Sequence, residues 1–274
     1  MIKQYLFASD FDQTLSFDDS GLVLTGLLGI PVKEFEDKTA GMAQLNLVQQ
    51  GAELSYLLLH DPAFQSKVRR HHLIETGKRI PVKENIQLLY QTLRDGIPGY
   101  EFDFYVLSAA PVEIVQSALE DIVPADHIFG TEFEWNADGS IGRLLRCTAG
   151  YGKVARIVQL QSELSIGPDH VVYCGDGSSD IHAMLQVNDG AGLTIAVSES
   201  RSVTQIARRT VLSDSALSVL VPILEEVAHW TQSQIRRFFE QQGFLMQEWA
   251  RMRTDVVTLR PTGAMHASAV EEGR

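Results

Sequence analysis

Two aspartates directly follow the first apolar run of the chain. The run Leu6–Ala8 carries no charge, as expected of a strand buried on both faces of a parallel sheet. Asp10 and Asp12 are separated by one residue, so an extended backbone directs both carboxylates to one side. Two anions so close repel each other unless a cation lies between them or one carboxyl keeps its proton. The pair therefore indicates a metal site or acid–base chemistry, although a DxD sequence alone is more often a solvated loop.

Further polar side chains come directly after later apolar runs, or open the helix that follows one: Ser108, Lys153, Asp176 and Asp180. Taken singly, each has an ordinary explanation as a helix cap, a solvated lysine or a turn. Because the carboxyl ends of parallel strands face one way, we expect these groups to converge with Asp10 on one crevice.

Such a set of groups suits phosphoryl transfer, which needs a nucleophile, a proton donor, positive charge and a metal. Asp10 is the candidate nucleophile, because a carboxylate at the end of a strand is held rigidly and can form an acyl phosphate. Asp12 is the candidate acid and base, because the Asp10 charge disfavours its ionised form.

The later segments supply the charge and the metal ligands. Lys153 is a point charge at a helix start, where free N–H groups also favour an anion, and the Ser108 hydroxyl adds a hydrogen bond. Asp176 is a natural ligand for Mg²⁺, which binds a few carboxylates and completes its shell with water and phosphate oxygen. Asp180 either binds the metal or orients Lys153.

The order of these groups resembles the four motifs of the haloacid dehalogenase superfamily of phosphohydrolases. DFDQTL is similar to the first motif, Ser108 to the second, Lys153 to the third and GDGSSD to the fourth, over residues 2 to about 212. The resemblance implies an aspartyl-phosphate on Asp10. The expected phosphate ligands are Thr14, Ser108, Ala109 and Lys153. The expected Mg²⁺ ligands are Asp10, Asp12 through its carbonyl, Asp176 and, if it binds directly, Asp180.

An acid at position 12 favours the phosphatase-type members of that superfamily. A helical insertion after the first motif and the hairpin signal at 128–144 are similar to its phosphoserine phosphatase-like branch. In that resemblance Asp19 lies where a substrate-sensing Glu is usual, and Arg69 and Arg70 would serve a substrate anion. Ser108 is followed by two alanines instead of two glycines, which adds bulk where the backbone would meet the substrate.

The rest of the chain divides into an α/β core and helical additions. Apolar runs alternate with helical patterns, which predicts a doubly wound, parallel α/β sheet formed by residues 1–16 and 94–214. Helical periodicity predicts a small cap over residues 17–93 and a C-terminal extension over 215–260, whereas residues 261–274 are expected to be a disordered tail.

Two stretches leave alternatives open. Residues 67–79 carry five Lys or Arg and two His, and they form either a solvated helix face or a patch that faces a ligand. The C-terminal extension is rich in large aromatics, including Trp230, Phe238 and Trp249. These side chains pack either on the core or on a second copy of the chain, and we favour a homodimer.

Composition restricts the partners. The formal net charge of −12 excludes a nucleic-acid partner, which needs a basic field, and suits a divalent cation. Cys147 and Cys174 match neither a zinc spacing nor a disulfide framework. The start of the sequence lacks a signal peptide, and no run approaches the roughly 20 apolar residues of a membrane span. We therefore expect a cytoplasmic protein without a membrane partner.

These observations predict a Mg²⁺-dependent phosphomonoester hydrolase that acts on a small phosphorylated metabolite. A phosphotransferase that passes the phosphoryl group to an alcohol is the alternative enzyme. A binding or regulatory module that keeps the fold without turnover is the alternative from another class.

Overall fold

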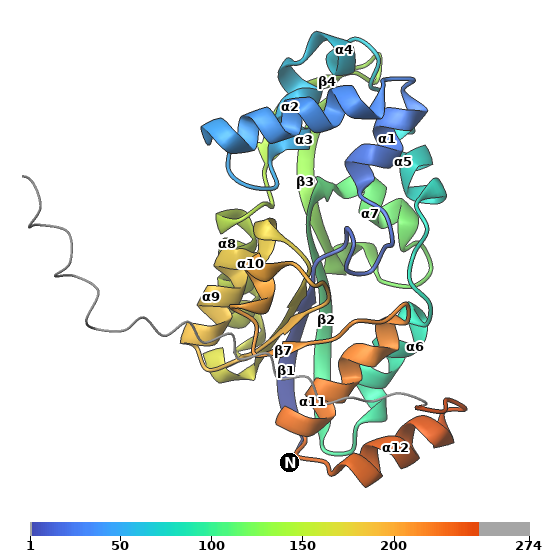
Figure 1. The fold of residues 1–274 in the computed structure, drawn as a ribbon, viewed down its shortest axis with the longest axis vertical. Helices are drawn as coiled ribbons and strands as arrows, with labels where there is room; N and C mark the ends of the chain where they lie inside the picture. The colour runs from blue at the N-terminus through green and yellow to red at the C-terminus, as the bar shows by residue number, and fades with distance from the viewer. Residues whose placement is uncertain (1, 247–274) are drawn as a thin grey trace, which may run out of the picture.

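A seven-stranded sheet forms the centre of the molecule within residues 2–246, the part of the chain that the computed structural model describes (Figure 1). The strand order is β4-β3-β2-β1-β5-β6-β7, and every neighbouring pair is parallel except β3 and β4. The predicted doubly wound α/β fold is therefore confirmed. The strands are β1 (Lys3–Ser9), β2 (Tyr100–Pro111), β3 (Ile128–Trp135), β4 (Ile141–Arg146), β5 (Val171–Gly175), β6 (Leu193–Ala196) and β7 (Arg209–Thr210).

Helices connect these strands and also form the insertion after β1. The α-helices are α1 (Ser20–Leu27), α2 (Val32–Leu45), α3 (Glu53–His60), α4 (Pro62–Gln65), α5 (Arg70–Arg79), α6 (Ile86–Gln91), α7 (Val112–Ala118), α8 (Tyr151–Leu164), α9 (Ile181–Asp189), α10 (Arg201–Thr204), α11 (Leu220–Glu226) and α12 (Gln232–Gln241). Between residues 2 and 246, no helix combines the length and the apolar character needed to cross a bilayer.

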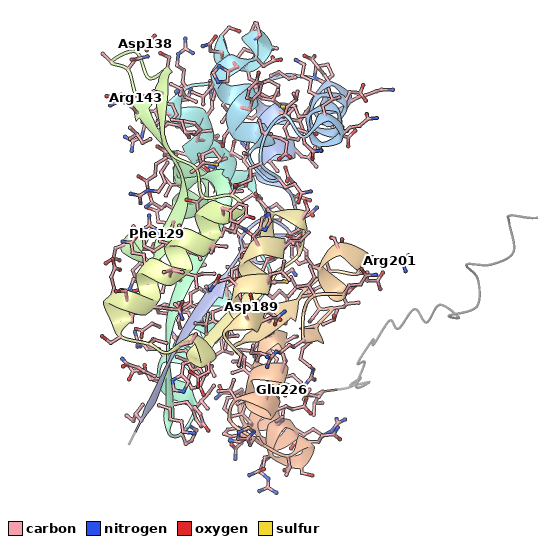
Figure 2. The ribbon with its side chains drawn as sticks, turned by 90° about the vertical axis from the view of Figure 1, so that its left-hand side faces the viewer. Phe129, Asp138, Arg143, Asp189, Arg201 and Glu226 are labelled. Carbon is pink, nitrogen blue, oxygen red and sulfur yellow. The ribbon has the colours of Figure 1, made fainter. Side chains whose placement is uncertain are left out.

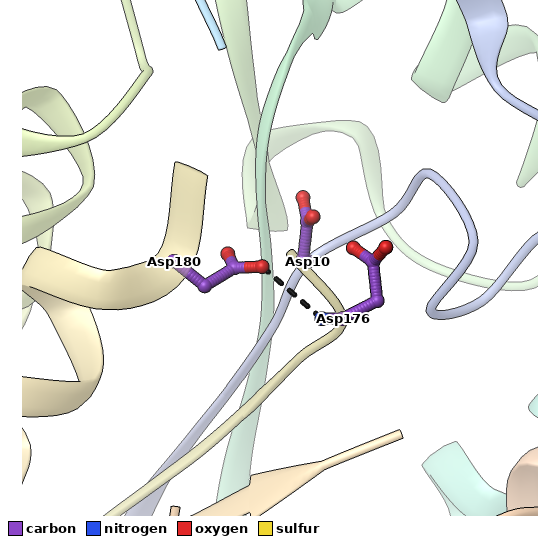
Figure 3. Close-up of side chains that lie close together, drawn as sticks. All are labelled: Asp10, Asp176 and Asp180. Carbon is purple, nitrogen blue, oxygen red and sulfur yellow. Dashed lines mark hydrogen bonds between the residues drawn. The ribbon is translucent and has the colours of Figure 1, made fainter. Parts of the chain in front are cut away.

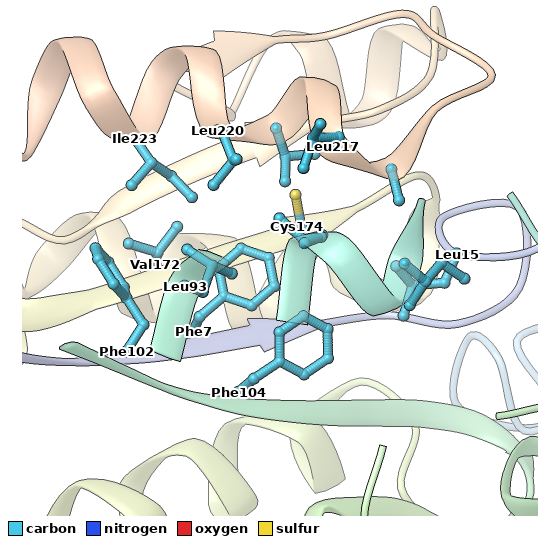
Figure 4. Packing of buried hydrophobic residues seen from close by; sticks show 14 of the residues in the cluster. Phe7, Leu15, Leu93, Phe102, Phe104, Val172, Cys174, Leu217, Leu220 and Ile223 are labelled. Carbon is cyan, nitrogen blue, oxygen red and sulfur yellow. The ribbon is translucent and has the colours of Figure 1, made fainter. Parts of the chain in front are cut away.

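The central strand β1 separates two apolar cores. Tyr5 and Phe7 belong to the cluster that α6, α11 and α12 cover, whereas Leu6 and Ala8 belong to the cluster under α8 and α9 (Figures 1 and 4). Alternate side chains of a strand point to opposite faces, so both faces of this strand are buried. Burying one such phenylalanine stabilises the fold by about 1.5–3 kcal/mol.

Helices α1 to α5 gather at one end of the molecule, beyond the strand ends that follow Ser9 (Figure 1). Their own core includes Leu24, Phe35 and Leu58, and it is completed by Phe133 and Ile141 of the β3–β4 hairpin. Figure 2 labels Asp138 and Arg143 near the tip of this hairpin, at the opposite end of the molecule from Glu226 of α11.

Helix α6 ends the stretch predicted as the cap, but it packs elsewhere. Ile86 and Leu89 lie in the cluster that also holds Phe7 and Phe104 of the central strands. The helix therefore contributes its apolar face to the sheet. The cap boundaries at residues 17 and 93 stay a prediction.

The C-terminal helices bury their aromatics within one chain. Phe238 and Phe239 are buried in the main core cluster, and Trp230 and Phe244 are partly buried against it. This apolar area therefore no longer requires a second subunit. The homodimer stays a prediction, and Trp249 and the tail 261–274 lie outside the described residues.

Candidate active site

Asp10 is the first residue after β1 and is fixed to the neighbouring strand. Its N–H donates to the carbonyl oxygen of Cys174 in β5 at 2.9 Å, and only 3% of its surface is exposed. The backbone then turns, because Thr14 and Leu15 both donate to the Phe11 carbonyl oxygen. The extended backbone expected as far as Asp12 is thus replaced by a turn.

Asp12 nevertheless reaches the same cavity as Asp10, through a contact with the first helix of the insertion. Asp12 Oδ1 accepts hydrogen bonds from both the N–H and the hydroxyl of Ser20, at the start of α1. Both aspartates line a cavity of about 450 Å³ between the sheet and helices α1 to α3. Both carboxylates therefore face one cavity, although the backbone path between them differs from the extended one expected.

Lys153 is the cation at the base of this site. It is the third residue of α8, and its side chain has no exposed surface. Its ammonium lies 2.8 Å from Asp10 Oδ1 and 2.6 Å from Asp180 Oδ1. Lys153 therefore links the end of β1 to the turn that follows β5.

Asp180 uses both carboxylate oxygens to position its neighbours. Its Oδ1 accepts hydrogen bonds from Lys153 Nζ and from the Tyr173 hydroxyl, both at 2.6 Å. The N–H groups of Asp176 and Gly177 donate to Oδ2 at 3.1 Å each (Figure 3 draws the first). A carboxylate accepts about four such bonds. Asp180 thus orients Lys153 and the turn, and its direct binding to a metal stays a prediction.

Three carboxylates lie close enough together to surround a divalent cation. Oxygens of Asp10, Asp176 and Asp180 lie within 4.8 Å of one another, where β1 and β5 end (Figure 3). Because Asp180 is fully hydrogen-bonded, Asp10 and Asp176 are the two with ligand capacity left. Hard oxygen donors at the edge of an open cavity suit Mg²⁺, which keeps several of its waters.

The electrostatics of the site also favour a cation. Burial and, after it, the charge of Asp180 raise the pKa of Asp10 to about 7, although Lys153 opposes both. Burial, followed by the charge of Asp10, raises the pKa of Asp176 to about 8. Burial lowers the pKa of Lys153, but Asp10 and Asp180 outweigh it and hold that pKa above the ordinary value. The single positive charge of Lys153 thus does not balance the carboxylates of Asp10, Asp176 and Asp180.

Asp12 is the group best suited to hold a proton. Burial raises its pKa well above the ordinary value, and the charge of Asp19 raises it further. The hydrogen bonds from Ser20 oppose this shift without cancelling it. A carboxyl with this environment can donate a proton near neutral pH.

Of the predicted phosphate ligands other than Lys153, one lines the cavity and two do not. Ala109 lines the cavity, whereas neither Ser108 nor Thr14 is among the described residues that line it. Ser108 is fully buried inside β2, and its hydroxyl oxygen accepts the N–H of Ala110 at 3.1 Å. Thr14 is buried too, and its hydroxyl has no hydrogen-bond partner among the described residues.

The loop between α2 and α3 closes one side of the cavity. Gln49 donates a side-chain hydrogen bond to the carbonyl oxygen of Ala149, just before α8. Gly51 has a φ of +89°, and a Cβ there would lie 2.8 Å from the Cβ of Ser179. Glycine therefore allows this loop to reach the GDGSSD turn.

The predicted substrate-selecting residues divide between two places. Asp19 lines the cavity. Arg69 instead donates to the carbonyl oxygens of Ser66 and Val68, and the Arg70 Nε lies 3.6 Å from Glu113 Oε1. Neither arginine is among the described residues that line the cavity, so their part in selection stays a prediction.

Sequence comparison identifies the family. The model of the haloacid dehalogenase-like hydrolases matches residues 7–185, about two thirds of the chain. The chain belongs to this family. No curated protein sequence matches it.

Solved structures of haloacid dehalogenase-like and phosphoserine phosphatase-like proteins share the fold. A phosphoserine phosphohydrolase-like protein from Francisella tularensis subsp. tularensis SCHU S4 is 20% identical with a TM-score of 0.61, and the match covers 79% of this chain and 99% of that one. A substrate-bound phosphoserine phosphatase is 18% identical with a TM-score of 0.64 and coverage of 83% and 100%. A probable phosphoserine phosphatase from Vibrio cholerae is 17% identical with a TM-score of 0.60 and coverage of 84% and 68%.

Some residues at this haloacid dehalogenase-like site escaped the sequence analysis. Tyr173 belongs to an apolar run, and nothing in that pattern indicates that its hydroxyl binds Asp180. Glu53 lines the cavity from the first turn of α3, more than 40 residues from Asp10. The only sequence signal for Glu53 is its place shortly after Gly51, a glycine between two helices.

Proposed function

We propose that this haloacid dehalogenase-like protein is a Mg²⁺-dependent phosphomonoester hydrolase that acts on a small phosphorylated metabolite. One observation carries the proposal: Lys153 lies between the carboxylates of Asp10 and Asp180, directly beside a cavity that Asp12 and Asp176 also line. A nucleophile, a proton donor, a fixed cation and metal ligands thus meet at one end of the sheet. A structure with the same fold is described as a phospho-aspartyl intermediate analogue of phosphoserine phosphatase.

In the first step, an oxygen of Asp10 bonds to phosphorus as the bond from phosphorus to the leaving oxygen breaks. Asp12 gives its proton to that oxygen, so the alcohol leaves neutral. The Lys153 ammonium offsets charge on the transferred phosphoryl group. In the second step, Asp12 takes a proton from water, whose oxygen displaces Asp10 and releases inorganic phosphate.

Asp10 and Asp176 would hold the Mg²⁺, with the Asp12 carbonyl as the further ligand that the family resemblance implies. When bound, the ion supplies positive charge that lets the anionic phosphate approach the anionic Asp10. The protein's own part is to hold Asp10 between Lys153 and the cavity and to keep Asp12 protonated until the leaving group forms.

Phosphate release tests this proposal. We expect p-nitrophenyl phosphate and a panel of phosphorylated metabolites to be hydrolysed with Mg²⁺ and not with a chelator. Asp10→Asn should reduce the rate to background, whereas Asp18→Asn, an exposed neighbour, should not change it. Activity above a few per cent in Asp10→Asn would remove Asp10 from the nucleophile role. Phosphate that appears on an added alcohol would instead identify a phosphotransferase, and no turnover on any substrate would favour a binding module.

The setting of the protein is part of the same proposal. Cys147 and Cys174 are both free, which suits a reducing cytoplasm. Light scattering over a dilution series tests the proposed homodimer, because a mass that stays monomeric would exclude it.

A further inference from the structure

The helices of the insertion contribute acidic side chains to the cavity. Asp19 and Glu53 line it, in addition to the catalytic carboxylates. Among the described residues that line the cavity, none is a lysine, arginine or histidine. Lys153 lies below the cavity and is already bonded to Asp10 and Asp180. A leaving group in this cavity therefore meets acids and no basic side chain.

Asp19 and Glu53 are held in place by backbone N–H groups rather than by basic side chains. Asp19 Oδ1 accepts the N–H of Leu22 at 3.1 Å and caps α1, and Glu53 Oε2 accepts the N–H of Gly51 at 2.8 Å. These donors are neutral amides, and each acid has a second oxygen beyond these bonds. Between residues 2 and 246 no salt bridge joins either acid to a basic side chain. Burial raises the pKa of both Asp19 and Glu53, and the charge of Asp19 adds to the shift of Glu53, so a cation between them would favour their ionised forms.

An aromatic ring lies beside one of these acids. Phe35 of α2 lines the cavity, and Gly21 separates it from Asp19. A Cβ on Gly21 would lie 2.5 Å from Phe35 Cζ and 2.9 Å from Asp19 Oδ1. Glycine at position 21 thus lets the ring and the carboxylate approach each other closely. A carboxylate beside an aromatic ring is a favourable environment for an ammonium group.

We infer that the substrate is the phosphomonoester of an amino alcohol, with an ammonium group and no carboxylate on its leaving group. This inference rests on the proposed function and adds the class of substrate. The ammonium would lie between Asp19 and Glu53, against Phe35, while the phosphate reaches Asp10. A carboxylate on the leaving group would meet the same two acids with no basic partner, and like charges at close range exclude a ligand.

Binding of non-hydrolysable phosphonates tests the charge preference without turnover. Three probes differ in one terminal group: 3-aminopropylphosphonate, butylphosphonate and 4-phosphonobutanoate. Titration calorimetry with Mg²⁺ present should give an affinity for the ammonium probe at least about tenfold above that for the butyl probe. The carboxylate probe should bind more weakly than both.

Matched variants locate the preference. Asp19→Asn keeps a good helix cap and Glu53→Gln keeps the shape, so both should fold. Each should reduce the preference for ammonium over butyl, and the double variant should bring the two probes within about twofold. Glu36→Gln removes one negative charge from an exposed position on α2 and should leave the preference unchanged.

Equal affinities of the ammonium and butyl probes would overturn the inference, as would a preference that persists in the double variant or the failure of every probe to bind. Failure of the proposed function is recognised separately. Hydrolysis of p-nitrophenyl phosphate, which has no ammonium, reports the chemistry alone. If the enzyme hydrolyses it but shows no ammonium preference, only the substrate class is wrong.

Discussion

Lys153 Nζ lies 2.6 Å from Asp180 Oδ1, and neither side chain has any exposed surface. Two charges without solvent contact stabilise the fold only while both are present, because removal of one leaves the other buried alone. Asp10, the second partner of Lys153, is nearly as buried. The proposed catalytic cation is therefore also a structural element.

Replacing this lysine should thus affect both activity and stability. We expect Lys153→Met to abolish hydrolysis and to reduce the free energy of unfolding by about 3–5 kcal/mol, since Asp10 and Asp180 lose their cation. Urea unfolding measures the loss. In an Asp180→Asn background the same substitution should cost less, whereas strictly additive losses would show that the two side chains do not interact.

The Tyr173 hydroxyl donates a hydrogen bond to Asp180, the partner of Lys153. Tyr173→Phe removes one donor of Asp180 and changes little else, so the free energy of unfolding should fall by about 1.5–3 kcal/mol. Hydrolysis should remain, because Lys153 still holds both carboxylates. Tyr151→Phe is the control, since the Tyr151 side chain is exposed. Equal stability of the two variants would mean that the buried hydroxyl contributes nothing.

Metal binding should depend on pH. Without metal, the pKa values of Asp10 and Asp176 are raised to about 7 and about 8, above the ordinary 3.8. Between the ordinary pKa and these raised values, the folded state holds more protons than the unfolded chain. The free energy of unfolding therefore falls as pH rises through this range. We expect Mg²⁺ to bind the ionised carboxylates and so to reverse this loss.

Thermal unfolding with Mg²⁺ and with a chelator, from about pH 5 to about pH 9, checks this dependence. The difference in melting temperature should widen up to about pH 8, the pKa of Asp176. Asp176→Asn should reduce the difference at every pH. A gap independent of pH would contradict the assignment of these carboxylates as ligands.

Asp12 should act in both chemical steps. Asp12→Asn removes the proton donor and the base, so turnover should fall by about 10²- to 10⁴-fold. With an activated ester such as p-nitrophenyl phosphate, the leaving group needs little protonation, and phosphorylated Asp10 should accumulate. Mass spectrometry of the quenched protein detects this adduct. Asp18→Asn should show neither effect, and an unphosphorylated Asp12→Asn protein would assign the water-activating role to another group.

The C-terminal helices should stabilise a single chain. Phe239 is 5% exposed in the main core, so Phe239→Ala should reduce the free energy of unfolding by about 3–5 kcal/mol. Leu245→Ala, at a side chain that is 77% exposed, should change it by no more than about 0.5 kcal/mol. A loss in Phe239→Ala that depends on protein concentration would instead place this helix at a subunit interface.

The residues at the strand ends could be predicted from sequence, because strand alternation and the common direction of parallel strands determine where they meet. Asp10 and Asp176, which directly follow β1 and β5, satisfy this condition, and Asp12 and Lys153 reach the same place from a turn and from a helix start. Ser108 does not, because β2 continues to Pro111 and buries it. The cap was harder to predict. The direction of Arg69 and Glu53 depends on how short helices pack on one another, and the charge pattern along the sequence contains no such information.

The alternation along β1 also determines the location of Asp10. Since Tyr5 and Phe7 pack into one core and Leu6 and Ala8 into the other, a shift of this strand by one residue would exchange the two sets of side chains. Aromatic rings would then fill the space that Leu6 and Ala8 occupy. Packing on both faces therefore fixes the register of β1. Because Asp10 directly follows this strand, the same packing places it beside Lys153.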